Sequence, residues 1–180
     1  MKTPLRAPVL LALLTALALP APARADLWVA ISGGVTFPTG TTAFGNLEVQ
    51  PAATLAVGYD LEHVGASLSA GFVSSRAGAL LQENCVPILV RVRGRLPLGI
   101  AVPSVYGAAG VAPSRAIVNL VQYDTTAFAG QAGGGLDLVF GDMFTLGVEG
   151  GWQWLSPSYP FGTVRMDGAT LFATVALRFQ

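Results

Sequence analysis

The chain has 180 residues, of which 52% are apolar and only 11% are charged. An average soluble domain carries about 25% charged residues, and a disordered chain needs low hydrophobicity with high net charge, so the composition argues against both classes. The formal net charge of zero argues against a nucleic-acid-binding protein, and the single Cys excludes an internal disulfide framework or a thiolate zinc cluster.

The first 25 residues have the layout of a secretory signal peptide. Lys2 and Arg6 make a positive start, residues 9–19 are an uncharged apolar run, and residues 23–25 (Ala-Arg-Ala) offer a small-residue cleavage site. The apolar run is too short for a membrane helix, which needs ~20 residues. We therefore expect a mature chain of residues 26–180, which holds seven Arg, no Lys and ten acidic residues and has a formal charge of −3.

The mature chain alternates between apolar residues and small or polar residues, which is the period of a β-strand. The clearest case is 88–95, where Ile88, Val90 and Val92 oppose three arginines. The pattern predicts eight strands of roughly 10 residues, the length that a tilted membrane-spanning strand needs. Their approximate ranges are 27–37, 53–61, 64–72, 88–95, 102–112, 128–140, 144–154 and 169–179. The residues of 102–112 are too uniform to indicate which face points outward.

The connections between these strands alternate in length. The long ones are at about 38–50, 75–85, 113–125 and 156–164, and the short ones are at about 60–63, 97–101 and 140–142. Outer-membrane barrels have long extracellular loops and short periplasmic turns. Only helices and closed barrels can satisfy backbone polar groups inside a bilayer. The sequence therefore predicts an all-β fold, an eight-stranded antiparallel transmembrane β-barrel with its N-terminus in the periplasm.

Aromatic residues fall at both ends of the predicted apolar faces, as the interfacial girdles of membrane barrels do. The expected inner girdle comprises Tyr59, Phe140, Phe144 and Phe179, and the expected outer girdle comprises Phe37, Phe72, Phe128, Trp152 and Trp154. Trp28 and Phe172 have the opposite parity and should point inward.

Charged residues on the polar faces would point into the barrel. The expected network comprises Arg91, Arg93, Arg95, Arg178, Asp60, Asp137 and Glu149. An eight-stranded barrel is just wide enough for side chains to fill, and buried charges need partners. By depth along the strands, Arg91 should lie near Glu149. Arg93 and Arg95 should lie nearer the two aspartates, with Arg178 in the same half. This network is either a salt-bridged plug or, alternatively, the lining of a narrow anion-preferring channel.

Two segments resemble a known family. GGGLDLVFGDMFTLGVEGGWQWL (133–155) and ATLFATVALRF (169–179) are similar to the last hairpin and the closing strand of small eight-stranded outer-membrane barrels, the group of the OmpA transmembrane domain and OmpX. The resemblance implies insertion by the β-barrel assembly machinery, which reads a terminal aromatic residue, and contact with outer-membrane lipids and lipopolysaccharide. Here the aromatic residue is penultimate, because Gln180 follows Phe179.

Catalytic signatures are absent from the sequence. The single His63 falls in a predicted turn and no G-x-S-x-G occurs, so we expect a non-enzymatic protein without a cofactor. Its expected role is structural or surface interaction, with an extracellular partner meeting loops such as 156–164. The remaining alternative is a secreted, soluble, lipocalin-like barrel that binds an apolar ligand inside. The direction of the apolar face separates the membrane barrel from the soluble barrel, because a soluble barrel turns its apolar face inward. Cys85 is expected to be an unpaired thiol.

Overall fold

The computed structural model describes residues 26–42, 45–78 and 80–179. The expected signal peptide, residues 1–25, lies outside the described residues. Regular secondary structure in the described part of the chain consists of β-strands. No helix in these ranges has the length and apolar character that crossing a membrane requires.

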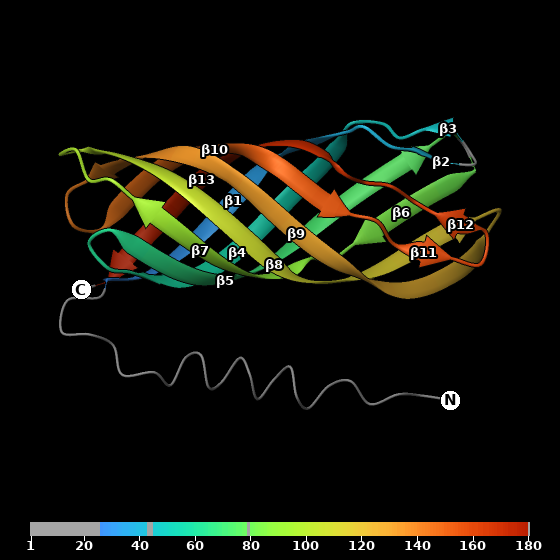
Figure 1. The fold of residues 1–180 in the computed structure, drawn as a ribbon, viewed down its shortest axis with the longest axis horizontal. Coiled ribbons are helices and arrows are strands. Elements are labelled where there is room, and N and C mark those ends of the chain that lie inside the picture. Colours follow the sequence, from blue (N-terminus) through green and yellow to red (C-terminus); the bar gives the residue numbers. More distant parts are fainter. Residues whose placement is uncertain (1–25, 43–44, 79, 180) are drawn as a thin grey trace, which may run out of the picture.

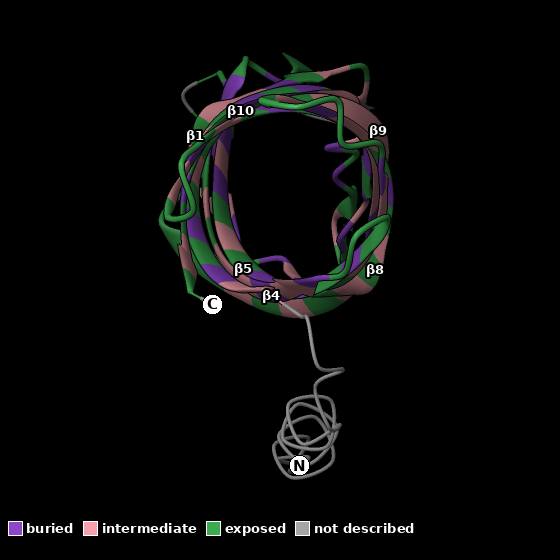
Figure 2. Cartoon of the chain, turned by 90° about the vertical axis from the view of Figure 1, so that its left-hand side faces the viewer, coloured by how far each residue is buried: buried purple, intermediate pink, exposed green. Residues whose placement is uncertain are grey.

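The long strands form one antiparallel sheet that closes into a ring (Figure 2). They are β1 (Asp26–Pro38), β4 (Gln50–Asp60), β5 (Val64–Ala77), β6 (Leu81–Cys85), β7 (Ile88–Arg95), β8 (Ala101–Val118), β9 (Val121–Phe140), β10 (Phe144–Leu155) and β13 (Gly168–Phe179). β6 and β7 each pair with both β5 and β8, so they share one position in the ring. β1 pairs with β4 on one side and β13 on the other, which closes the barrel. The predicted eight-stranded antiparallel barrel is confirmed.

The two ends of the barrel differ (Figure 1). At the end that we name the terminal end, β1 starts and β13 finishes, and tight turns join β4 to β5, β7 to β8 and β9 to β10, where the short connections are predicted. At the opposite end, named the loop end, two connections carry small two-stranded ribbons. These are β2 (Thr41–Thr42) with β3 (Gly45–Asn46), and β11 (Ser158–Tyr159) with β12 (Gly162–Thr163).

The prediction of a long loop at 113–125 is wrong. β8 and β9 stay paired as far as Val118 and Val121, so only Asn119 and Leu120 turn the chain. Both residues have positive φ, 49° and 69°, as a two-residue type I′ hairpin requires. Leu120 is 97% exposed at the tip of this hairpin.

The loop predicted at 75–85 is also mainly strand, because β5 runs to Ala77 and β6 starts at Leu81. Both errors have one physical cause: near the loop end the strands keep their alternation but exchange the polarity of their faces. On β9, the outward residue is aromatic at Phe128 but charged at Asp124, four residues nearer the loop end. The inward residues Ala127 and Tyr123 are partly buried against the apolar core. A strand that is predicted from its apolar outer face therefore ends several residues before the observed strand does.

Over the rest of the wall the outward face is apolar, as the alternation predicts. Val90 is 59% exposed and Val92 56%, whereas the inward Ser67 and Ser69 on the neighbouring strand are buried. Figure 2 shows this alternation as successive bands of exposed and buried residues along each strand. A soluble barrel with an apolar interior would have the reverse arrangement here. Trp28 and Phe172, predicted to point inward, are both buried.

The interior has two zones. Toward the loop end, apolar side chains of the wall pack against residues that follow β10, and Leu81, Leu155 and Met166 there are almost completely buried. Toward the terminal end, the inward side chains are mostly small, polar or charged. The expectation of a polar and charged lumen therefore describes the terminal half only. β8, which the sequence could not orient, turns Val102 and Tyr106 inward.

Val90→Arg tests the assignment of the outer face. Val90 lies on the outward face of β7, four residues by register from the level of Phe72, because it pairs with Leu68. We expect the substitution to lower the free energy of unfolding in lipid vesicles by ~2–4 kcal/mol, the cost of a cation near the middle of a bilayer. Thr126→Arg, beyond Phe128 on β9, is the control and should change stability much less. Equal effects of the two substitutions would contradict the assignment.

Candidate functional site

The three arginines of β7 occupy alternate positions of one strand and therefore all point inward. Their side chains are 16%, 12% and 5% exposed for Arg91, Arg93 and Arg95. The register places small residues on both sides of Arg91, because Ser67 and Ala108 flank it on the neighbouring strands. Arg93 lies between Gly65 on β5 and Tyr106 on β8.

Arg91 is held by a carboxylate, an amide and an aromatic ring. Its Nη1 donates to Glu149 Oε2 at 2.6 Å, and its Nη2 donates to Gln131 Oε1 at 3.3 Å. The guanidinium carbon lies 4.1 Å from the centroid of the Tyr106 ring, within the range of a cation–π contact. Gln131 in turn donates to Gln153, so the contacts extend from β7 across the barrel to β10.

Asp60 is the centre of a second cluster nearer the terminal end. Its Oδ2 lies 2.7 Å from Arg93 Nη2, 3.0 Å from Arg95 Nη1 and 3.3 Å from Arg178 Nη2. The side chain is only 1% exposed, so the three guanidinium groups take the place of solvent around the carboxylate. Asp137 Oδ2 lies 3.2 Å from Arg93 Nη1 and adds a second negative charge to the cluster.

Two glycines make space for these carboxylates. A Cβ at Gly65 would collide with Asp60 Oδ1, and a Cβ at Gly147 would collide with Asp137 Oδ1. Both glycines face inward on strands beside a charged residue. The absence of their side chains is what lets an aspartate lie flat against the wall and meet an arginine from another strand.

The structure thus brings all seven predicted charged residues into two clusters, with the partners that strand depth predicts. Sequence reasoning missed Tyr106, Gln131 and Asp26, whose Oδ2 lies 3.8 Å from Arg178. It also missed the contact between Arg93 and the ring of Trp28, 5.0 Å away. The inward parity of Trp28 was the available signal for that contact, whereas Tyr106 lies on the strand that could not be oriented.

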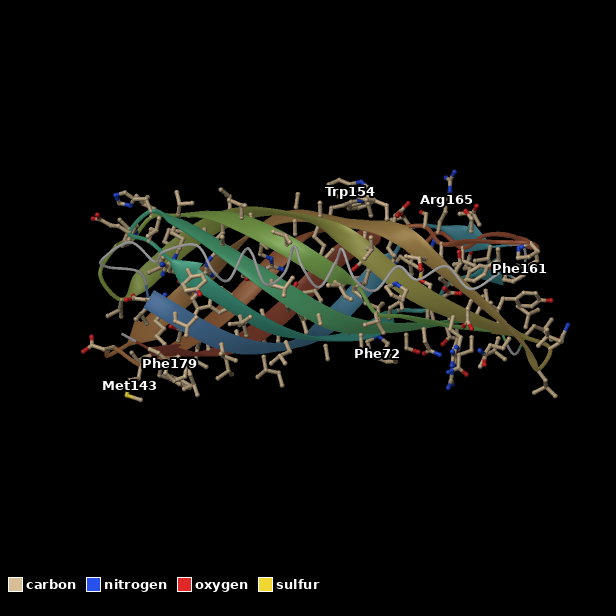
Figure 3. The ribbon with its side chains drawn as sticks, turned by 90° about the horizontal axis from the view of Figure 1, so that it is seen from below. Phe72, Met143, Trp154, Phe161, Arg165 and Phe179 are labelled. Carbon is tan, nitrogen blue, oxygen red and sulfur yellow. The ribbon has the colours of Figure 1, made fainter. Side chains whose placement is uncertain are left out.

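The predicted girdle aromatics all lie on the outward face. Seven of them, Phe37, Phe72, Phe128, Phe140, Trp152, Trp154 and Phe179, are exposed, and Tyr59 and Phe144 are half-buried. Figure 3 shows Phe179 at the terminal end, and Phe72 and Trp154 further toward the loop end, each projecting away from the ribbon. The register agrees with these levels, since Phe179 pairs with Leu27 and Phe37 pairs with Ala169.

A separate polar contact lies at the loop end, beyond the level of Phe72. Tyr159 Oη donates to Glu83 Oε1 at 2.5 Å, and Cys85 Sγ lies 3.5 Å from the same oxygen. Cys85 is the buried last residue of β6, has a free thiol, and accepts a hydrogen bond from Ser114. Burial raises the pKa of the Glu83 carboxyl to about 7, outweighing the opposite effect of its two hydrogen bonds.

His63 lies in the exposed turn after β4, with its Nε2 3.8 Å from Glu62 Oε1. Within the described ranges, no group of three or more His, Cys, Asp or Glu side chains is placed to hold a metal ion.

Comparison with known proteins identifies the architecture. No protein-family model and no curated protein matches the sequence. Among solved structures, Neisserial surface protein A has a TM-score of 0.61 at 12% identity, covering 86% of this chain and 97% of that one. The N-terminal β-barrel domain of Pseudomonas aeruginosa OprF has a TM-score of 0.58 at 14% identity, covering 86% and 97%.

The fold is that of a small outer-membrane β-barrel. A third solved structure of this fold, the outer membrane protein OprG from Pseudomonas aeruginosa, has a TM-score of 0.55 at 12% identity and covers 86% of this chain and 96% of its own. The similarity to these barrels extends along almost their whole length. The inward arginines of β7 are therefore part of a complete outer-membrane barrel fold.

A double-mutant cycle tests the contact between Arg91 and Glu149. Arg91→Ala leaves a carboxylate without its cation, and removing one partner of a buried pair costs ~3–5 kcal/mol. We expect Glu149→Gln to recover part of that loss in the Arg91→Ala background, measured by denaturant unfolding. The exposed pair of Arg115 and Asp124 is the control, and Arg115→Ala should have a much smaller effect. Additive effects of the two inward substitutions would contradict the pairing.

Proposed function

We propose that the mature chain, residues 26–180, is a non-enzymatic protein of the outer membrane. In this proposal the barrel is a closed structural scaffold and its loop end faces outside the cell for surface interaction. The observation that carries the proposal is the arrangement of the wall: apolar and aromatic side chains cover its outside, while the inward arginines meet carboxylates. A lipid environment suits such a wall, because lipid solvates the outer face without hydrogen bonds.

A closed barrel is supported by the contents of both interior zones. In the terminal half, Arg91, Arg93 and Arg95 each have a carboxylate oxygen within 3.0 Å. A passing anion would have to displace those carboxylates. In the loop half, buried Leu155 and Met166 belong to a cluster of apolar side chains inside the barrel. We therefore favour the salt-bridged plug over the narrow anion-preferring channel.

Surface interaction is supported by apolar groups displayed on a rigid scaffold. The rings of Tyr159 and Phe161 stack with centroids 5.1 Å apart, and Tyr123 meets Phe161 edge-on at 5.2 Å. These contacts tie the ribbon of β11 and β12 to β9. Beside it, the paired β8–β9 hairpin carries Leu120 at its tip. Exposed apolar groups on fixed loops are frequent contact sites for partners.

Export and assembly form part of the same proposal. The signal peptide at 1–25 would direct the chain across the inner membrane and be removed. Insertion would use the β-barrel assembly machinery, with Phe179 as the aromatic residue of its closing strand. Lipids and lipopolysaccharide of the outer membrane would then surround the outward face between the two aromatic girdles.

Cell fractionation with gel electrophoresis tests the proposed location. We expect the protein in the outer-membrane fraction, cleaved before Asp26 as shown by N-terminal sequencing. We also expect different mobility in unboiled and boiled detergent samples, because a closed barrel resists detergent until it is heated. Recovery from the soluble periplasm or the medium, with one mobility under both conditions, would contradict the proposal and favour the soluble lipocalin-like alternative.

Single-channel recording in planar bilayers tests the plug. The purified barrel should show at most small, infrequent openings, because side chains fill its interior. A 16-stranded porin, whose aqueous channel stays open, is the positive control for the recording. Large, steady conductance with anion selectivity would overturn the plug and favour the channel.

A further inference from the structure

Four polar side chains form a buried row across neighbouring strands at the loop end. Thr36 on β1 pairs with Gln50 on β4, and Ser75 on β5 pairs with Glu83 on β6. The register between β4 and β5 places Ala52 opposite Val73, and two further residues in each strand place Gln50 opposite Ser75. The four residues therefore follow one another around the inside of the wall. Their relative exposures are 0%, 0%, 2% and 0% in that order.

This row holds most of the unsatisfied polar atoms in the described ranges. Eight buried side-chain nitrogen or oxygen atoms there lack a hydrogen-bond partner, and five of them belong to these four residues. They are Thr36 Oγ1, Gln50 Oε1 and Nε2, Ser75 Oγ and Glu83 Oε2. Buried polar atoms are almost always paired with protein, ordered water or an ion. A concentration of such atoms on one inward surface therefore points to a bound group.

The row also contains a carboxylate without a cation. Glu83 Oε1 has Tyr159 and Cys85 beside it, but both are neutral donors. The three described arginines of the loop end, Arg76, Arg115 and Arg165, are exposed on the outside, and Figure 3 shows Arg165 projecting away from the barrel. Buried charges are normally paired or coordinate a metal. The terminal half of the barrel follows this rule with its inward arginines, whereas the three described arginines of the loop end point outward.

We infer that the row is a binding site for one monovalent metal cation of sodium or potassium size, held by Glu83 Oε2 with Ser75 Oγ and Gln50 Oε1. Carboxylate, amide and hydroxyl oxygens suit hard cations, whereas soft metals select thiolate ligands. The single carboxylate balances one positive charge. Calcium sites usually hold several carboxylates around the doubly charged ion, and this row has one. Thr36 Oγ1 and Gln50 Nε2 extend the site toward β1 and would meet water bound beside the ion.

Complete burial decides how the site must be loaded. Glu83 is completely buried and its carboxylate is hydrogen-bonded to Tyr159, so an ion would enter while the barrel folds. The barrel should therefore be refolded from denaturant into detergent in sodium, potassium or choline chloride at equal ionic strength. We expect a higher unfolding temperature in sodium or potassium than in choline, whose cation is too large for the row.

Two carboxylate substitutions make this measurement specific. Glu83→Gln keeps the shape and removes the charge, so the difference between sodium or potassium and choline should disappear. Glu48→Gln removes an exposed carboxylate at the same end of the barrel and should leave the difference unchanged. A difference that persists in Glu83→Gln, or no difference in the unsubstituted protein, would overturn the site.

Crystals of the unsubstituted protein, refolded in thallium(I) salt, provide an independent measurement. We expect an anomalous peak between Glu83, Ser75 and Gln50. Density with no anomalous signal would show that water and a proton satisfy the row, and would overturn the cation. This experiment decides the question even when Glu83→Gln fails to fold.

Discussion

The closure of the backbone hydrogen-bond ladder is the constraint on which the rest of the structure depends. Once β1 pairs with both β4 and β13, no strand edge is left, and the wall can face a medium that offers no hydrogen bonds. The outward side chains are then free to be apolar. A soluble protein would use the same residues for its core. Here the inside of a narrow ring has to be filled by whatever the other face of each strand supplies.

In the terminal half, charged side chains fill the interior, and the contacts of Asp60 show how they are stabilised. Arginine is costly to enclose without a partner, and here the guanidinium groups of Arg93, Arg95 and Arg178 all meet the Asp60 carboxylate, with Asp137 and Asp26 supplying further negative charge. The cluster joins β4, β7 and β13, which are not neighbours in the ring. It therefore braces the barrel across its interior, where the hydrogen-bond ladder around the wall cannot. These contacts also resist flattening of the ring.

The sequence predicted the parts of this design that depend on local alternation. Strand count, the inward and outward faces of the strands with clear alternation, and the partner of Arg91 all follow from period two and from counting residues to the turns. Tyr106 was not predictable, because Ala, Gly and Val surround it on both faces of β8. The contact between Glu83 and Tyr159 joins residues 76 positions apart through a loop, and alternation carries no information about such a contact.

The segments 75–85 and 113–125, predicted as loops but found mainly as strands, show where an apolar outer face no longer marks a strand. Past Phe128 the outward positions of β9 become polar, with Gln122 donating to Asp124, while the inward positions join an apolar cluster. An outward face that is polar no longer carries the apolar side chains of the strand, so they turn inward and form a core, as in a soluble sheet. One continuous strand thus turns its apolar side chains outward over most of the wall and inward near the loop end. The buried row formed by Thr36, Gln50, Ser75 and Glu83 lies toward the loop end, where neither inward arginines nor solvent are present to satisfy its polar groups.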